Sequence, residues 1–429
     1  MKIALVNPPW RFEGSIYFGC KAEHLPIELG AARALLLREG HEVLMLDGAL
    51  DDLDAEGAAD RVAAFAPDLT VLTTAPTYLF WRCAPPELRS PRAFLDTLGG
   101  RGGRTVAVGP HVSVTPQTTL RKLGCDLGIR GECEEALVEL AGGQEVGTIS
   151  GMAWREGEDV RVLGGPRATT FTDLPVLEWP DHWIQRHGHH HHRYGTEPVG
   201  LGAEVEASRG CPYSCSFCAK IDFRDKYRRR DLPVLLEEID RLIGQGVRYL
   251  YFIDEIFLPW RQLLEALVER GIEFGVQTRI DLWKPQMIEL LGRAGCVSIE
   301  AGVESITEEG RAALDKDCRV TTDTLTERLL LAREHVPFVQ ANLIEVSADE
   351  QADLERWRDE VRSHGVWAND PVPLYPYPSS PDYRKLWGAP DEKAWERAHA
   401  HYLSEFDRFS DIQDARPLPL ETIEASFAQ

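Results

Sequence analysis

The sequence contains no run of about eighteen apolar residues, the length that a membrane-spanning helix requires, and no secretory signal peptide. Disulfides persist in secreted proteins and are rare in the cytoplasm. The chain has nine cysteines in 429 residues, and without a signal peptide we expect their thiols to stay reduced. We therefore expect a soluble, cytoplasmic protein with no membrane contact, long enough to form two or three domains.

Basic residues are scarce compared with acidic ones. There are 47 lysines and arginines against 69 aspartates and glutamates, which gives a net charge of −22. Proteins that bind nucleic acid carry a basic surface, so we expect no nucleic-acid partner. One local exception, residues 223–230, is rich in arginine. This pattern favours a solvated start of a helix over a clamp for phosphate or carboxylate.

Three of the nine cysteines, Cys211, Cys215 and Cys218, lie close together in the sequence. Residues 202–207 before them read as a short strand, so the thiols are expected on the loop at its carboxyl end, where α/β folds gather catalytic groups. Three thiolates suit zinc or an iron-sulfur cluster. Zinc sites usually close with four protein ligands, and no fourth cysteine or histidine follows at finger-like spacing. Three cysteines leave one position open, and the pattern favours an iron-sulfur cluster over a partial zinc site.

The Cys-x3-Cys-x2-Cys spacing, with an aromatic Phe217 before the last cysteine, resembles the radical S-adenosylmethionine (SAM) superfamily. The resemblance implies that Cys211, Cys215 and Cys218 hold a 4Fe-4S cluster whose fourth iron binds the amino and carboxylate groups of SAM. One electron from the cluster then cleaves SAM to methionine and a 5'-deoxyadenosyl radical, which removes a hydrogen atom from a small-molecule substrate. An electron donor such as flavodoxin or ferredoxin is implied as a partner.

The part of the chain before the cysteines alternates strands with helices. Strands are predicted at residues 2–6, 42–46, 69–73, 105–108 and 127–129, and helices at residues 29–37, 58–65, 91–98, 117–123 and 134–141. Alternation at these lengths predicts a doubly wound, Rossmann-like parallel sheet. A ligand in such a sheet lies along the carboxyl edge of the strands.

The loops at this edge resemble those of the cobalamin-binding domain that precedes the barrel in many radical SAM enzymes. The residues that the resemblance assigns to cobalamin are Pro8, Pro9, Thr73, Thr74, Ala75, Gly109, Pro110, His111, Gly131 and Glu132. An Asp-x-His-x-x-Gly motif is absent, so the resemblance implies cobalamin without a lower axial imidazole, its lower face covered by the loop at residues 69–76. The alternative is an unoccupied domain retained for packing or for partner contact.

After the cysteines, six strand-helix units predict a partial (β/α)6 barrel. Its strands are expected at residues 202–207, 249–252, 273–277, 297–301, 338–346 and 366–369, and its helices at residues 232–243, 261–269, 285–294, 324–335 and 352–364. Polar groups at barrel strand ends are where such folds place their chemistry. The residues that the superfamily resemblance assigns to SAM are Phe217, Asp254, Glu255, Gln277, Arg279, Glu300, Gly302 and Glu304. For Glu300 and Glu304, the alternative is an acidic helix start with ion pairs.

These patterns divide the chain into four parts. They are a cobalamin-binding domain at residues 1–147, a connector at 148–200, the radical SAM barrel at 201–370 and a short, mainly helical segment at 371–429. The connector contains His187 and residues 189–192, a histidine tract that favours a surface linker over a metal or substrate site. The aromatic residues of the last segment, Trp387, Trp395 and Tyr402, favour core packing over a cap on the substrate cavity.

The functional hypothesis is a cobalamin-dependent radical SAM enzyme. The resemblance implies C-methylation of an unactivated carbon of a sugar or secondary metabolite through the 5'-deoxyadenosyl radical and methylcobalamin. A second hypothesis keeps the radical without methyl transfer: dehydration, deoxygenation or rearrangement of a sugar or aminocyclitol, with the first domain empty or structural. A third, a corrinoid or cluster carrier, is disfavoured because a carrier does not need Asp254, Arg279 and Glu300 at barrel strand ends.

Overall fold

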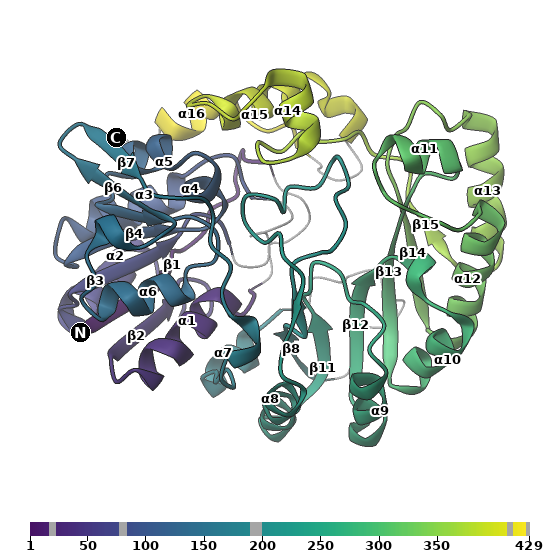
Figure 1. Ribbon diagram of the computed structural model, residues 1–429, viewed down its shortest axis with the longest axis horizontal. Coiled ribbons are helices and arrows are strands. Elements are labelled where there is room, and N and C mark those ends of the chain that lie inside the picture. Colours follow the sequence, from purple (N-terminus) through teal and green to yellow (C-terminus); the bar gives the residue numbers. More distant parts are fainter. Residues whose placement is uncertain (17–22, 77–83, 189–199, 410–414, 426–429) are drawn as a thin grey trace. The chain divides into compact units, whose positions relative to one another are not determined.

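The computed structural model describes residues 1–16, 23–76, 84–188, 200–409 and 415–425 (Figure 1). Cys20, Cys83, residues 77–83 and the histidines at 189–192 lie outside the described residues. The position of Arg193 and Tyr194 near the cysteine loop in the sequence predicts contacts with the substrate, but these two residues lie outside the described ranges as well. The chain forms two compact units. The first comprises Met1–His190, Cys218–Lys226 and Tyr375–Gln429, and the second comprises His191–Phe217 and Tyr227–Leu374.

The first unit contains a seven-stranded sheet in the order β2-β1-β3-β4-β5-β6-β7. Its strands are β1 (Lys2–Asn7), β2 (Glu42–Asp47), β3 (Leu69–Thr73), β4 (Arg104–Val108), β5 (Leu127–Ile129), β6 (Met152–Glu156) and β7 (Asp159–Val162). The first five strands are parallel, which confirms the predicted Rossmann-like sheet. The hairpin β6–β7, which the sequence assigned to the connector, joins this sheet antiparallel to β5 and pairs the backbone groups of a strand that would otherwise be an edge.

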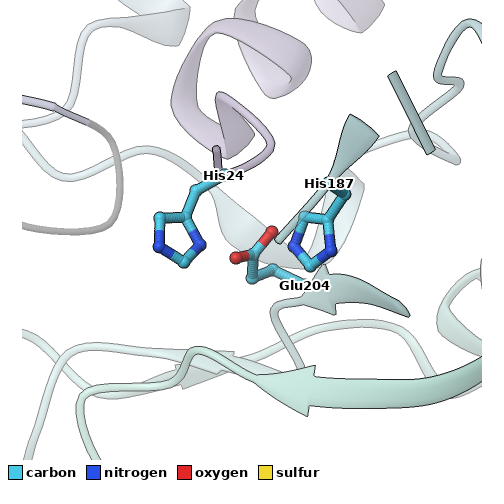
Figure 2. Close-up of side chains that lie close together, drawn as sticks. All are labelled: His24, His187 and Glu204. Atoms are coloured by element: carbon cyan, nitrogen blue, oxygen red, sulfur yellow. The ribbon is translucent and has the colours of Figure 1, made fainter. Parts of the chain in front are cut away.

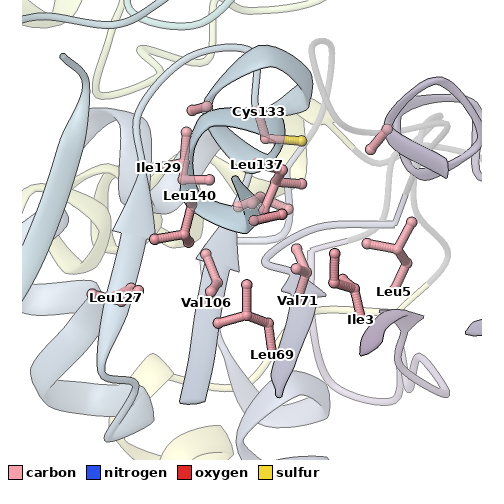
Figure 3. Close-up of a cluster of buried hydrophobic side chains, with 14 of the residues drawn as sticks. Ile3, Leu5, Leu69, Val71, Val106, Leu127, Ile129, Cys133, Leu137 and Leu140 are labelled. Carbon is pink, nitrogen blue, oxygen red and sulfur yellow. The ribbon is translucent and has the colours of Figure 1, made fainter. Parts of the chain in front are cut away.

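Helices cover both faces of this sheet. They are α1 (Ile27–Arg38) and α6 (Glu134–Ala141) on one face, and α2 (Ala55–Phe65), α3 (Arg89–Leu98) and α5 (Pro116–Leu123) on the other. Successive side chains of a strand point to opposite faces. Ile3 and Leu5 of β1 therefore lie in the core beside α1 and α6 (Figure 3), whereas Ala4 and Val6 lie in the core on the opposite face.

The end of the chain also packs within the first unit. Its helices are α14 (Pro381–Trp387), α15 (Ala394–Ser404) and α16 (Leu420–Ala425). Trp395 and Tyr402 of α15 are buried, so the predicted core packing is confirmed for these two side chains. Lys122 at the end of α5 binds α15 and α16 through Glu396 at 2.7 Å and Glu424 at 2.9 Å. The C-terminal helices are thus attached to the first sheet's own helices by both apolar and charged contacts.

The second unit contains six parallel strands in the order β15-β14-β13-β12-β11-β8. They are β8 (Leu201–Val205), β11 (Val247–Phe252), β12 (Glu273–Thr278), β13 (Cys296–Glu304), β14 (Phe338–Leu343) and β15 (Trp367–Ala368). The helices between them are α8 (Leu232–Gly244), α9 (Arg261–Arg270), α10 (Pro285–Arg293), α11 (Glu308–Ala313), α12 (Thr322–His335) and α13 (Gln351–Ser363) (Figure 1). The six strands and five helices predicted from the sequence are confirmed, and α11 is a further helix that the sequence did not predict.

The prediction of a solvated helix start at residues 223–230 is wrong for two of its arginines. Arg224 and Arg230 are 1% and 3% exposed. Arg224 lies 3.1 Å from Glu28 and Arg230 lies 2.6 Å from Glu238, and both carboxylates are buried. Burial of a guanidinium is unfavourable unless its charge and hydrogen bonds are compensated, and the sequence pattern did not reveal these partners. In the described part of the chain, no helix is both long and apolar enough to cross a membrane.

Gly131 is one of the residues that the resemblance assigns to cobalamin, and its backbone conformation alone accounts for a glycine at this position. Its φ of 78° lies in the left-handed region, and a Cβ there would lie 2.3 Å from the carbonyl oxygen of Arg167. The next residue, Glu132, donates its N–H to the same oxygen at 3.1 Å and accepts the N–H of Thr169 at 3.1 Å. Position 131 must therefore be glycine, because the segment 166–169 passes directly against its backbone at the end of β5.

We expect Gly131→Ala to destabilise the first unit. The left-handed backbone costs a non-glycine residue about 1–2 kcal/mol, and the contact with Arg167 adds about 1–3 kcal/mol. Gly143→Ala is the matched control, because Gly143 has a φ of 87° with no atom within 4 Å of its Cβ position. Thermal unfolding followed by circular dichroism should show a larger fall in Tm for Gly131→Ala. Equal falls would contradict the contact.

Candidate functional site

The stem of the cysteine loop is held by two acidic residues at the end of β11. Asp254 accepts hydrogen bonds from the Ala207 N–H at 2.8 Å and from the Ser208 hydroxyl, and Glu255 accepts from the Gly210 N–H at 2.6 Å. Burial raises the pKa of the Asp254 carboxyl well above its ordinary value. Both residues, assigned to SAM by the sequence, therefore contact the backbone that leads into Cys211.

The predicted cluster ligands lie on the loop that follows. Cys211, Cys215 and Cys218 are each partly exposed, as is Phe217. The stem is further stiffened by the two-residue strands β9 (Ser208–Arg209) and β10 (Arg228–Arg229), which pair antiparallel. The boundary between the two units falls after Phe217, so that Cys211 and Cys215 belong to the second unit and Cys218 to the first. Three partly exposed thiols on one short loop fit the donor set of a three-cysteine iron-sulfur cluster.

Arg279, which follows β12, contacts the middle of the cysteine loop. Its guanidinium lies 4.0 Å from the ring centroid of Tyr213, between the first two cysteines. Asp281 fixes the guanidinium through two hydrogen bonds of 2.8 and 3.1 Å. The carbonyl oxygens of Lys316 and Asp317 accept its remaining N–H groups. Arg279 is 6% exposed, so this bidentate, stacked arrangement is one that lysine cannot reproduce.

Glu304 ends β13 beside a buried lysine. The ammonium of Lys316 forms an ion pair with Glu304 and donates to the Gly302 carbonyl oxygen at 3.0 Å. A Cβ on Gly302 would lie 2.6 Å from Glu304 Oε1, so the glycine leaves room for the carboxylate. Burial raises the pKa of the Cys215 thiol; the charges of Lys316 and Arg279 oppose this shift and that of Glu304 adds to it. The ion pair expected in the alternative interpretation of Glu304 is confirmed. The helix start expected there is wrong, because Glu304 is the last residue of the strand β13.

Gln277 and Glu300 lie side by side on neighbouring strands of the second sheet. Both are partly buried. Among the residues that the structure describes, none forms a hydrogen bond with the buried Gln277 Oε1 atom. A buried polar atom without a partner costs about 1–3 kcal/mol, so it marks a position where a ligand would supply the missing donor.

In the first unit, Thr73, one of the predicted edge residues, belongs to a hydrogen-bonded network with Asn7, Asp47 and Trp10. The Asp47 carboxylate accepts a hydrogen bond from the side-chain Nδ2 of Asn7 at 2.7 Å. The side-chain Oδ1 of Asn7 accepts from the Thr73 hydroxyl at 2.8 Å and from the Trp10 indole N–H at 2.7 Å. Burial raises the pKa of Asp47 to about 6. The neighbouring Thr74 hydroxyl has no partner among the described residues. Hydrogen bonds therefore link the carboxyl ends of β1, β2 and β3.

His111 is enclosed by the protein. The sequence read residues 109–111 as a loop, but Gly109, with a φ of 117°, caps a short helix, α4 (Pro110–Val114). The His111 ring stacks on Trp395 with 4.1 Å between centroids, and the Trp395 N–H donates to Thr115 at 3.1 Å. Burial, together with the charge of Lys122, lowers the pKa of His111 to about 3. The imidazole is therefore neutral and covered by α15.

A cavity of about 1030 Å³ lies beside the edge of β1 and β2. Pro9 and Trp10 line it from the loop after β1, Gly48 from the loop after β2, and Arg89 from the start of α3. A Cβ on Gly48 would lie 2.4 Å from the Cα atom of Pro9, so the two loops meet directly. Pro9 is partly exposed, whereas the other nine residues assigned to cobalamin are buried. The sheet edge thus offers an opening at its β1 and β2 side.

His187, the first residue of the histidine tract, lies beside His24 in the first unit. Their rings are 5.9 Å apart between centroids in an edge-to-face arrangement (Figure 2). The His24 side chain is buried and that of His187 is partly buried. At His187 the chain is therefore packed against the first unit rather than solvated. The surface linker favoured from the composition of the tract is therefore wrong at its first residue.

Several residues of the site were missed by sequence reasoning. Lys316, Asp281 and Tyr213 surround Arg279 and the cysteine loop, and Trp395 covers His111. Tyr213 could have been found because it lies inside the cysteine motif. Lys316 carries no sequence signal, and for Trp395 the sequence predicted core packing but not its partner His111.

Residues 205–353 match the family model described as the Radical SAM superfamily. This range runs from the end of β8, through the cysteine loop, to the start of α13. The match therefore covers most of the second unit, together with Cys218–Lys226 of the first.

Similar proteins extend the likeness over more of the chain. An uncharacterized methyltransferase of Pyrococcus horikoshii is 26% identical over 320 residues, 71% of this chain and 66% of that protein. Anaerobic magnesium-protoporphyrin IX monomethyl ester cyclase of Cereibacter sphaeroides is 25% identical over 413 residues, 90% of this chain and 64% of that protein. The chain thus spans about two thirds of the length of these curated relatives.

Among solved structures, the radical SAM methyltransferase TsrM from Kitasatospora setae, with cobalamin and a [4Fe-4S] cluster bound, is similar. The TM-score is 0.70 at 20% sequence identity, over 89% of this chain and 76% of that chain. At this identity the likeness establishes a shared fold.

We expect replacement of Cys211, Cys215 or Cys218 by Ala to abolish both iron retention and SAM cleavage, because a methyl group cannot replace a thiolate ligand. Cys296→Ala is the control. Cys296 is 2% exposed at the start of β13, and burial raises its pKa above the ordinary thiol value. Iron per chain, measured after anaerobic reconstitution, should fall only in the three loop variants. Full iron and activity in any one of them would overturn the assignment.

The enclosed His111 should make the first unit sensitive to acid. Its folded pKa of about 3 lies below the ordinary value of 6.5, so the unfolded chain binds the extra proton between these pH values. Stability should therefore fall by about 1.4 kcal/mol per pH unit as the pH drops below about 6.5. The fall in stability with falling pH should be smaller in His111→Leu. In His364→Leu, a change at an exposed position, it should be the same as in the wild type. Tm measured at pH 7.5 and pH 5 tests the difference; parallel pH profiles for all three proteins would contradict it.

Proposed function

We propose that this chain is a cobalamin-dependent radical SAM methyltransferase. The observation that carries the proposal is the three-cysteine loop at the carboxyl end of the second sheet, with its stem fixed by Asp254 and Glu255. The match of residues 205–353 to the Radical SAM superfamily supports it. The C-terminal ends of parallel strands are the general location of such sites.

Cys211, Cys215 and Cys218 would hold a 4Fe-4S cluster, and a bound cluster supplies the electron that cleaves SAM. Around this loop the chain provides fixed groups. Gln277 would supply its unpaired Oε1 to the bound SAM, and Arg279 would hold the loop through Tyr213. Phe217, Glu300, Gly302 and Glu304 are proposed as further SAM contacts from the sequence resemblance.

The first unit would hold cobalamin, which when bound carries the methyl group to the substrate. The Rossmann-like sheet, the cavity beside β1 and β2 and the unpaired Thr74 hydroxyl support this. The bound cobalamin of TsrM and the methyltransferase name of the Pyrococcus relative support it as well. His111 stacks on Trp395 and would serve packing at this edge, which agrees with cobalamin lacking a protein imidazole.

The proposed reaction consumes two SAM molecules for each methyl group transferred. One SAM gives its methyl group and leaves as S-adenosylhomocysteine. The other is cleaved to methionine and 5'-deoxyadenosine, which carries away the hydrogen atom of the substrate C–H bond. A donor such as flavodoxin or ferredoxin supplies two electrons, which balance the two sulfonium charges lost. We propose a sugar or secondary metabolite with an unactivated carbon as the substrate.

A second candidate function is radical chemistry without methyl transfer. It is favoured by the magnesium-protoporphyrin cyclase, a relative that aligns with 90% of this chain and is not named a methyltransferase. In this case the substrate radical would end in dehydration, deoxygenation, rearrangement or ring closure. S-adenosylhomocysteine would then not be formed.

The product ratio distinguishes the two functions. We expect the anaerobically reconstituted protein, given SAM, cobalamin, a reductant and a substrate panel, to form 5'-deoxyadenosine, S-adenosylhomocysteine and a product heavier by one methyl group. The Cys215→Ala variant is the control, and all three products should be absent. An optical spectrum of protein purified from cells grown with cobalamin should show corrin absorbance beside that of the cluster. Formation of 5'-deoxyadenosine without S-adenosylhomocysteine would contradict methyl transfer and support the second function.

A further inference from the structure

Lys316 is a cation that the second unit buries almost completely. It is 1% exposed and lies on the loop at residues 314–317, between α11 and α12. Burying an ammonium is unfavourable unless its charge and hydrogen bonds are compensated. The Gly302 carbonyl oxygen and the Glu304 carboxylate provide this compensation. Such a pair contributes little to stability compared with apolar residues of the same size, so its retention calls for another reason.

The loop that carries Lys316 has an unusual backbone. Asp315 and Asp317, on either side of the lysine, have φ values of 51° and 49°. Left-handed conformations of non-glycine residues are uncommon, cost of order 1 kcal/mol each and cluster at functional sites. The shape turns the loop's carbonyl groups inward, where those of Lys316 and Asp317 accept the N–H groups of Arg279. The loop therefore gathers two buried cations at one place.

The same loop contacts the cysteine loop directly. The Ser216 N–H, next to Cys215 in the sequence, donates to the Leu314 carbonyl oxygen at 2.9 Å. On the other side, Arg279 lies over the ring of Tyr213. These two contacts bracket Cys215, so the Lys316 and Arg279 charges lie beside the segment that bears this thiol.

Three thiolate ligands bring negative charge to this region, and the reduction potential of an iron-sulfur cluster depends on the net charge around it. We propose that the Lys316–Glu304 pair tunes the reduction potential of the cluster on this loop, with Lys316 raising the potential and Glu304 lowering it. Lys316 is then a positioning and charge-setting residue, not a ligand. The inference rests on the proposed function, since it requires the cluster to form.

Opposite shifts from the two partners separate a charge effect from a structural one. Lys316→Met removes a positive charge and leaves Glu304 unopposed, so the midpoint potential should fall. Glu304→Gln leaves Lys316 unopposed, so the potential should rise. The double variant should shift less than either single change. A purely structural pair would instead lose iron or shift in the same direction in both variants.

The measurement is an EPR-monitored redox titration of the reconstituted protein without SAM, with iron per chain determined for each variant. Lys316→Arg should stay close to the wild-type potential because the charge is kept. Arg261 and Glu265 of α9 form an exposed ion pair in the same unit, so Arg261→Met and Glu265→Gln should leave the potential unchanged, since solvent screens their charges.

The outcomes distinguish this inference from the proposed function. If the wild-type protein binds no iron, the proposed function fails together with it. If the wild type forms the cluster and the Lys316 and Glu304 variants show no shift, shifts of the same sign or complete loss of iron, only this inference is overturned. Opposite shifts with retained iron support it.

Discussion

The structure of the second unit depends on the attachment of the cysteine loop to the end of β11. Asp254 binds the backbone and hydroxyl groups at residues 207 and 208, and Glu255 binds the Gly210 N–H. A loop that must present three thiols to one inorganic group cannot rely on its own short segments for rigidity, so the strand end supplies fixed acceptors. Arg279 and the loop at residues 314–317 hold the far side. Contacts that hold the loop on both sides limit the reorganisation that ligand binding requires.

The first sheet reaches rigidity at its carboxyl edge by a different route. Its polar residues satisfy one another, as in the network of Asn7, Asp47 and Thr73, and the end of the chain returns to cover His111 with Trp395. The C-terminal helices are thus part of the first unit's core, although the sequence separates them from it by the whole radical SAM domain. The β1 and β2 side of the edge opens into a cavity.

Local patterns in the sequence predicted the elements well. β3 and α6 begin and end where apolar periodicity and flanking glycine or proline place them, because both signals are contained within a few residues. The cysteine loop was predicted for the same reason. The burial of Arg224 and Lys316 could not be, because it depends on Glu28 and Glu304, which reach them only after folding. A charged residue with a distant partner looks solvated in a sequence.

The central claim is that Cys211, Cys215 and Cys218 hold a 4Fe-4S cluster with one iron open to SAM. Mössbauer spectroscopy of protein reconstituted anaerobically with 57Fe, recorded with and without SAM, tests it most directly. The account predicts a 4Fe-4S signal in which one iron site changes its isomer shift when SAM is added, because its coordination changes while three thiolates stay in place. A signal that SAM leaves unchanged, or a protein that takes up zinc and no iron cluster, would contradict it.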